Sequence, residues 1–533
     1  MIAAMGVRST HHGFGALDLA IVVLCGFLLL GVGLYFARRQ KTTEDFFVAG
    51  RNRSPVLAGV SLFAAMFTII AYIGVPGEVV QNGPVLVFGS VAALPFSYFI
   101  ITRYLIPAFM RLPITSGYEL LETRLGRPVR LTASFTFICV RLVWMSLVVY
   151  AASVVLVNVT GCDRRWLPLI AATIGLIATV YTLAGGIQAV MTTALLQFAL
   201  LLLGAALTVG LITLYAGGVR AWWPQEAPAY WMPQPFFSAD PHVRLTVVGT
   251  FLSYFISTVC AGGSDQVAIQ RYLTTRNAAA ASRAVMFGHL SVGITLLSLG
   301  CVGAALLGYF SLHPEQLPPG MVLGRGGDGL FPYFLGHGLP TGVSGLVVAG
   351  LLTSAVSGVA PGINSIIAVL NQEVVEPRVR KGTTAEGSKM KIARLLSLGI
   401  GVIITLGSLA MSLVTGNLVE VSSKTVNVFF YPMFGFFFLA LFVRFATSTG
   451  AILGALYGLT TAIVVGYWDT LTGMPRVSFQ WIGPSSLLVT LLAGCLFSLV
   501  PLKGRSPAIA WTFKGFALLA LAFAVSRVMA LHP

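Results

Sequence analysis

The stretch that most constrains this chain is Leu57–Gly83, which reads LAGVSLFAAMFTIIAYIGVPGEVVQNG. It is apolar enough to enter a membrane, yet Gly74, Pro76 and Gly77 interrupt the hydrogen-bond ladder of a helix. Glu78 then places a charge at the interruption. Lipid tolerates unpaired backbone groups only where protein or a water-filled cavity covers them. We therefore predict a broken membrane helix that lines a transporter's binding site. A kinked helix that serves only packing is the alternative.

Composition places the rest of the chain in a membrane as well. Of its 533 residues, 56% are hydrophobic and only 9% are charged, whereas about 25% of residues are charged in a typical soluble domain. Apolar runs of the roughly 20 residues that cross a bilayer recur throughout. We predict an all-α polytopic protein with about 14 spans. They lie near residues 17–37, 56–80, 85–109, 131–159, 167–184, 189–216, 245–262, 285–312, 343–370, 392–414, 419–443, 446–467, 485–500 and 508–529.

The predicted spans also set the organisation and orientation of the chain. Residues 1–16 form an N-terminal tail, 17–505 the transporter domain and 506–533 an extra C-terminal transmembrane helix. Basic residues concentrate in alternate connections, which predicts that both termini lie outside, because cytoplasmic loops are enriched in Lys and Arg. Examples are Arg38, Arg39, Arg124, Arg127, Arg271, Arg276, Arg378 and Arg380. The formal charge of +16 is thus a topology signal, and we expect no nucleic-acid partner.

The sequence carries no pattern typical of an enzyme. It contains no H-E-x-x-H, Walker or G-x-S-x-G motif, and its six cysteines show no metal-ligand spacing. We therefore predict a protein without catalytic residues.

Five stretches, taken together, resemble the sodium/solute symporter family in the same chain order. They read GRNRSP (Gly50–Pro55), IGVPGEVVQNG (Ile73–Gly83), YTLAGGIQAVMTTALLQ (Tyr181–Gln197), SDQVAIQR (Ser264–Arg271) and AGLLTSAVSGVAPGINSIIAVLNQE (Ala349–Glu373). The resemblance extends from about Asp18 to Val500. It implies a secondary active transporter of the LeuT type that works by alternating access. The inverted repeats would cover approximately 55–216 and 245–443, each beginning with a discontinuous helix.

The resemblance also implies a sodium site. Carbonyl oxygens of Ala64 and Phe67, in the first broken helix, would bind the ion together with Ser354, Ser357 and Gly358 in the ninth span. A hard cation takes oxygen ligands, and small residues let carbonyl groups approach closely. Members of the family typically carry a second hydroxyl residue where this chain has Gly358.

A second departure concerns the residue after Thr193, where many members have an aspartate and this chain has Ala194. Losing a hydroxyl and a carboxylate weakens a cation site, so proton-coupled or uncoupled transport stands beside sodium coupling. Glu78 and His289 are the candidates for proton coupling, because ionisable groups within membrane spans are functional candidates by default. A structural role for either residue is the alternative.

The expected cargo is a small organic solute. Polar residues facing the cavity would be Thr68, Tyr72, Tyr254, Ser257 and Thr258. Sugar-transporting relatives carry a Glu-Gln pair where this chain has Ile70 and Ala71. The chain therefore resembles the monocarboxylate, vitamin and iodide branch more than the sugar branch, which favours an organic anion.

No basic residue is evident at the cavity centre, and Arg141 is expected near a membrane surface, where its side chain would snorkel. A transporter-like membrane receptor is a further alternative. The expected location is among the lipids of a bacterial inner membrane.

Overall fold

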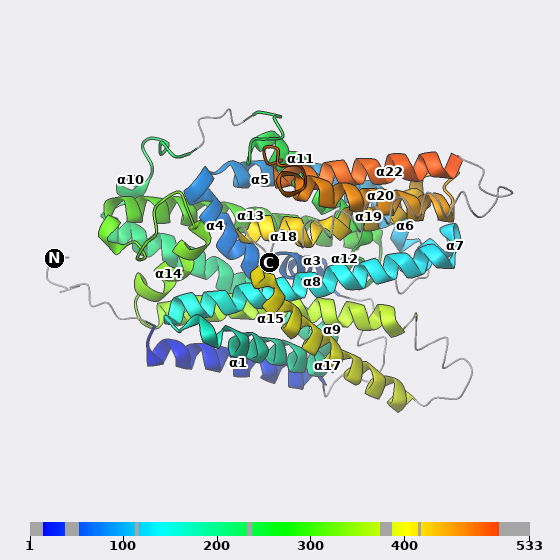
Figure 1. Ribbon diagram of the computed structural model, residues 1–533. Coiled ribbons are helices and arrows are strands. Elements are labelled where there is room, and N and C mark those ends of the chain that lie inside the picture. The colour runs from blue at the N-terminus through cyan, green and yellow to red at the C-terminus, as the bar shows by residue number, and fades with distance from the viewer. Residues whose placement is uncertain are drawn as a thin grey trace.

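The computed structural model describes residues 14–37, 53–111, 117–231, 237–371, 373, 386–413 and 417–499. These residues form helices joined by short loops, and the prediction of an all-α polytopic membrane protein is confirmed. In Figure 1 the long helices run side by side along one common direction. The predicted span at 508–529 and the tail at 1–13 lie outside the described residues.

The helices of the first half begin with a single long helix and then a broken one. Their bounds are α1 (Ala16–Ala37), α3 (Pro55–Met66), α4 (Ile69–Asn82), α5 (Val85–Ile100), η3 (Ile101–Leu105), α6 (Ile106–Met110), α7 (Tyr118–Leu125), α8 (Arg127–Thr160), η4 (Arg164–Trp166), α9 (Leu167–Ala216) and α10 (Val219–Trp222). Together, η4 and α9 contain two separate candidate membrane spans, Arg164–Leu183 and Ala189–Ala216. They correspond to the predicted spans at 167–184 and 189–216.

The second half also opens with a broken helix. Its elements are α11 (Val247–Ser264), α12 (Gln266–Leu273), α13 (Ala278–Leu312), η5 (Pro314–Gln316), η6 (Gly327–Gly329), α14 (Leu330–His337), α15 (Val343–Leu370), α17 (Glu386–Ala410), η8 (Met411–Leu413), α18 (Leu418–Thr425), α19 (Asn427–Phe442), α20 (Ser448–Gly466), α21 (Trp468–Thr472), η9 (Phe479–Trp481) and α22 (Ile482–Leu499). Within the described residues, ten helices are long and apolar enough to span a membrane, and two bent pairs raise that number to 12. A shorter apolar helix, Leu395–Ala410, occupies the place of the predicted tenth span.

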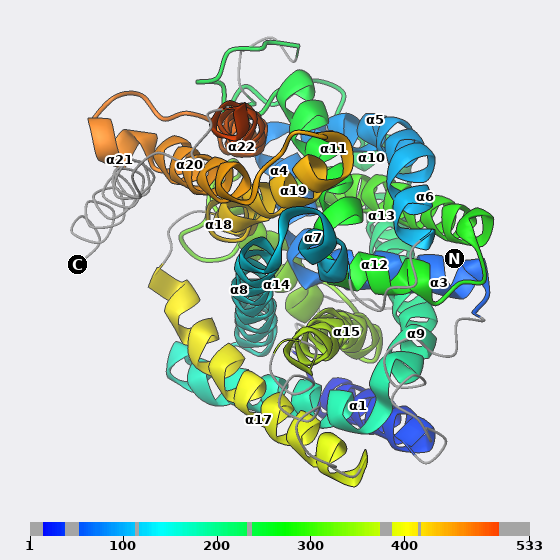
Figure 2. The same cartoon turned by 90° about the vertical axis from the view of Figure 1, so that its right-hand side faces the viewer.

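Three interruptions divide helices at the centre of the protein. The axes of α3 and α4 differ by 66°, and those of α18 and α19 by 45°. Between α11 and α12, Asp265 alone is extended. Figure 2 looks along the bundle and shows α3, α8, α12 and α15 near its middle, with α20 and α22 on one side and α1 and α17 on the opposite side. The interruptions therefore lie where other helices cover them, as unpaired backbone requires.

Close approach of helices depends on glycine at several contacts. A Cβ on Gly59 of α3 would lie 2.3 Å from the carbonyl oxygen of Ala284 on α13. Similarly, Gly454 of α20 lies against the backbone of Gly494 on α22. Small residues at helix contacts are typical of membrane bundles, because packing replaces the hydrophobic effect there.

Candidate solute and sodium sites at the helix breaks

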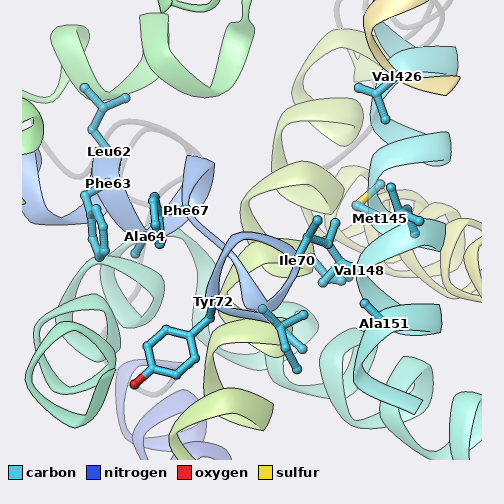
Figure 3. Packing of buried hydrophobic residues seen from close by; sticks show 14 of the residues in the cluster. Leu62, Phe63, Ala64, Phe67, Ile70, Tyr72, Met145, Val148, Ala151 and Val426 are labelled. Carbon is cyan, nitrogen blue, oxygen red and sulfur yellow. The ribbon is translucent and has the colours of Figure 1, made fainter. Parts of the chain in front are cut away.

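The first break consists of two extended residues, Phe67 and Thr68, between α3 and α4. The Phe67 amide donates to the Phe63 carbonyl, and α4 begins with bonds to the Thr68 carbonyl. Among the described residues, no backbone amide donates to the carbonyl oxygens of Ala64 and Phe67. Figure 3 shows these two residues at the end of α3, with Ile70 turned toward Val148. The predicted carbonyl ligands are thus free of helical hydrogen bonds.

Helix α15 packs against both halves of the broken helix. A Cβ on Gly358 would lie 2.7 Å from Cγ2 of Thr68, so α15 lies directly against the break. The hydroxyls of Ser357 and Thr68 are buried without a hydrogen-bond partner among the described residues. Ser354 donates to the Leu351 carbonyl at 2.8 Å, which leaves its oxygen lone pairs available. The structure therefore places Gly358 directly against the break, with Ser357 next to it and Ser354 one turn earlier on α15.

The second departure from the family pattern is also buried. The Thr193 hydroxyl bonds to the Tyr181 hydroxyl at 2.6 Å, and Ala194 beside it has no exposed surface. One turn further, both side-chain polar atoms of Gln197 are buried without a partner among the described residues.

The second break places a charge in the protein interior. Asp265 caps α12, because its Oδ1 accepts from the Val267 amide at 2.9 Å. Its Oδ2 forms an ion pair with Arg141 of α8, and both side chains are buried. The expectation that Arg141 snorkels to a membrane surface is therefore wrong. An arginine inside an apolar run is a sequence signal for a buried ion pair. Its partner Asp265 is 124 positions away in the chain, so the sequence alone did not reveal the pair.

Arg271 of α12 adds a second buried cation. It counted as a loop charge in the topology prediction, yet only 1% of its surface is exposed. Its Nε and Nη2 atoms have no hydrogen-bond partner among the described residues, and its guanidinium lies close enough to repel that of Arg141. The two cations and the single carboxylate of Asp265 give this described cluster a formal charge of +1.

A cavity of about 210 Å³ lies between the two breaks. It is lined by α3, α5, α8, α11, α12, α13 and the α18–α19 bend. The residues of its wall that carry a polar side-chain atom are Arg141, Trp144, Tyr254, Ser257, Thr258, Asp265, Tyr272, His289 and Asn427. A mostly apolar cavity with a few converging polar groups is typical of a small-molecule site.

Three of the five predicted solute-contacting residues line this cavity: Tyr254, Ser257 and Thr258. Thr68 and Tyr72 lie outside the lining. The Tyr72 hydroxyl donates to the Leu201 carbonyl at 2.6 Å, and its ring is fully buried, so it packs α4 against α9.

His289 of α13 also lines the cavity. Its Nδ1 lies 3.0 Å from the Val285 carbonyl oxygen, and its Nε2 lies 3.1 Å from the Ser97 hydroxyl. The Ser97 hydroxyl donates to the Leu94 carbonyl at 2.9 Å, so its oxygen faces Nε2 as an acceptor while the Val285 carbonyl faces Nδ1. A neutral imidazole carries one N–H group and donates to one of these two oxygens.

Glu78 lies away from the cavity, within a cluster of polar side chains at the far end of α4. Arg244 donates to its two carboxylate oxygens at 2.9 Å each. Asn82 donates to Oε2 at 2.7 Å, and Asn417 donates to Oε1. The sequence singled out Glu78, but two of its three partners, Arg244 and Asn417, lie 166 and 339 positions away, where no local pattern connects them to it.

The chain matches known proteins along most of its length. The family model described as "Sodium:solute symporter family" matches residues 46–458. The chain is 27% identical to the sodium/sialic acid symporter SiaT of Proteus mirabilis, over 91% of this chain and 95% of that protein. It is 28% identical to sodium-coupled monocarboxylate transporter 1 of Mus musculus, over 84% of this chain and 72% of that protein.

Solved structures are similar to the fold. A substrate-bound, outward-open Na⁺-coupled sialic acid symporter matches with a TM-score of 0.76 and 26% identity, covering 91% of this chain and 98% of that one. Mhp1, a nucleobase-cation-symport-1 family transporter, matches with a TM-score of 0.51 and 14% identity over 88% of this chain and 98% of that one. The second likeness concerns the fold alone. The expected LeuT-type architecture is confirmed.

Proposed function

The chain belongs to the sodium:solute symporter family, and from that membership we propose which solute it carries and which residues hold the coupling ion. It is an integral multi-pass membrane protein and a sodium-coupled solute symporter. We propose that the solute is a small organic anion, bound in the cavity between the two helix breaks.

The observation that carries this proposal is the buried arginine in the cavity wall. Arg141 shares its charge with Asp265, but the nearby guanidinium of Arg271 leaves the described cluster with a formal positive charge. A buried charge without a counter-charge is costly, and an incoming carboxylate supplies one. The planar guanidinium also offers several donors to a carboxylate, and Nε of Arg141 has no partner within the described residues.

The solutes for which the relatives are named agree with an acidic solute. The relatives include symporters of sialic acid and of monocarboxylates, which are both anions at neutral pH. The missing Glu-Gln pair at Ile70 and Ala71 argues against a neutral sugar. We therefore place the solute among organic acids, which include acidic sugars such as sialic acid as well as monocarboxylates.

For the coupling ion we propose the carbonyl oxygens of Ala64 and Phe67 with the hydroxyls of Ser354 and Ser357. Their support is the pair of unbonded carbonyls and the orphaned Ser357 hydroxyl beside the break. Sodium bound there bridges α3 to α15 and so stabilises one arrangement of the broken helix. Gly358 contributes a close helix approach in place of a ligand.

Transport would proceed by alternating access around these two sites. The predicted repeats, 55–216 and 245–443, each begin with a broken helix, and movement of one repeat against the other would expose the cavity to each side in turn. The predicted orientation has both termini outside, and we propose a bacterial inner membrane as the location.

Uptake into liposomes tests this proposal. Purified protein would be given radiolabelled monocarboxylates, sialic acid and neutral hexoses under an inward sodium gradient, an inward proton gradient or none. We expect uptake of an acid, driven by sodium. Uptake of neutral hexoses alone, or of acids driven only by protons, would contradict the proposal.

A matched pair of variants locates the sodium site. Ser357→Ala is expected to raise the sodium concentration needed for half-maximal uptake about tenfold or more, because a ligand is lost from a small set. Thr353→Ala removes a buried hydroxyl from the same helix that already donates to the Ala349 carbonyl at 2.7 Å, and we expect little change. Equal responses would show that Ser357 is not a ligand.

A further inference from the structure

The loop between α13 and α15 closes over the end of α4 through backbone packing. A Cβ on Gly77 would lie 2.8 Å from the carbonyl carbon of Gly327, so only glycine allows this approach. The side-chain amide of Gln81, oriented to satisfy both partners, accepts from the amides of Gly326 and Gly327 at 2.6 and 2.8 Å. The short η6 turn is thereby fixed against α4.

Asp328 in this turn joins the loop to a third element. Its Oδ2 accepts from the Leu418 amide at 2.6 Å, at the first residue of α18. Its Oδ1 is buried and has no partner among the described residues. We call the contacts of Asp328 with Leu418 and of Gly77 with Gly327 the latch; the structure shows it closed.

The charged groups around Asp328 differ in sign and come from several elements. From α4 the carboxylate of Glu78 raises the electrostatic cost of a second negative charge, and Arg244 partly offsets it. From α18, Glu420 turns instead to Arg244, Lys424 and Arg476. Arg164, before α9, lines the same cavity as Asp328. The titratable histidine of α14 is His337, whose Nδ1 contacts the Tyr333 carbonyl oxygen of the same helix.

We propose that Asp328 is a proton-responsive switch, and that protonation of its carboxyl group holds the latch closed. A carboxylate oxygen buried without a donor is unfavourable. Protonation replaces the buried charge with a neutral carboxyl group, which costs less to bury, and it removes the repulsion from Glu78. Opening the latch would return the carboxylate to water. The inference concerns regulation of access and goes beyond the proposed function, since it does not depend on which solute is carried.

The direction of the pH effect follows from linkage. Burial, together with the nearby Glu78, raises the pKa of Asp328 from 3.8 to about 6 in the closed latch. The closed form therefore binds the proton more tightly than an open form whose Asp328 faces water. Acidification through about pH 6 favours closure, and the closed-to-open ratio should rise about tenfold between pH 7 and pH 5.

Distances between spin labels would test this switch. The labels would be attached to cysteines introduced into a chain whose six native cysteines are alanine. One label replaces Arg325, in the loop that carries Asp328. The other replaces Met474, in a loop that is joined to α18 by the contact of Arg476 with Glu420. In nanodiscs with sodium, we expect the short-distance population to grow as pH falls from 7 to 5. Distances that do not change with pH in this labelled protein, whose Asp328 is intact, would overturn the proposal.

Three variants sharpen the result. Asp328→Asn should abolish the pH response, whereas Glu315→Gln, an exposed acid in the same loop, should retain it. In Gly77→Ala the distances between the two labels should stay long at every pH, because the added Cβ prevents the contact with Gly327 and so keeps the latch open. A full pH response in Asp328→Asn, or short distances in Gly77→Ala, would contradict the assignment.

Discussion

Arg244 donates to both carboxylate oxygens of Glu78 at 2.9 Å each, although the two residues are 166 positions apart. This pair joins α4 to the segment that precedes α11, so it links the two helices whose breaks enclose the cavity. Glu78 is fully buried and receives two further amide donors. Both of its oxygens are engaged in holding helices together.

Glu78→Gln should therefore weaken the fold at this end. The substitution removes the charge that Arg244 faces, and we expect a loss of about 2 kcal/mol, since Arg244 retains some access to water. Thermal unfolding in detergent would measure the lowered midpoint. Asp163→Asn, which breaks the exposed pair with Arg165, is the control and should change stability by less than about 1 kcal/mol. Equal shifts would contradict this account.

Arg141→Gln should raise KM for an acidic solute at least tenfold, because a charge-assisted hydrogen bond is worth about 1.5–3 kcal/mol. The single variant also leaves Asp265 unpaired, at a cost of about 3–5 kcal/mol in stability. Arg141→Gln combined with Asp265→Asn removes both members of the ion pair, so no carboxylate is left without its partner, and it should recover stability without recovering affinity. Uptake kinetics and thermal unfolding measured together separate the two effects. An unchanged KM in the double variant would exclude Arg141 from solute binding.

Gly358→Ala should destabilise the protein by about 1–3 kcal/mol, since its Cβ would overlap the Thr68 methyl group at 2.7 Å. Because Thr68 lies at the helix break, the apparent sodium affinity should fall as well. Gly399→Ala makes the same change on α17, where nothing lies within 4 Å, and should be neutral or slightly stabilising. Sodium-dependent thermal unfolding would compare them. If Gly358→Ala left both the stability and the sodium dependence unchanged, α15 would have to be able to move away from the break to accommodate the added Cβ.

His289→Gln should preserve sodium-driven accumulation of solute, because the two ring nitrogens are occupied by contacts with the Val285 carbonyl and the Ser97 hydroxyl inside the bundle. A change in KM is expected, since the residue lines the cavity. Uptake would be measured with sodium and proton gradients applied separately. If the variant lost only a proton-driven component, His289 would be a proton carrier.

Local sequence patterns predicted the elements of the fold well. Hydropathy and length placed the spans, and Val343–Leu370 has the predicted bounds. The first broken helix was also foreseen, but from Gly74, Pro76 and Gly77, whereas its axis turns at Phe67 and Thr68. The helix α4 continues through Pro76, because a single missing hydrogen bond kinks a helix without ending it where neighbouring helices cover it.

The sequence by itself determined that this chain crosses a membrane repeatedly, that the span within Leu57–Gly83 is broken, and which family it resembles. These properties depend on composition and on short motifs, which are local. Only the tertiary structure paired Arg141 with Asp265, Glu78 with Arg244, and Asp328 with Leu418. Such pairs join residues that are 90 to 166 positions apart. Burial of a charge is tolerated only when packing delivers a partner, so the partners follow from how the helices assemble.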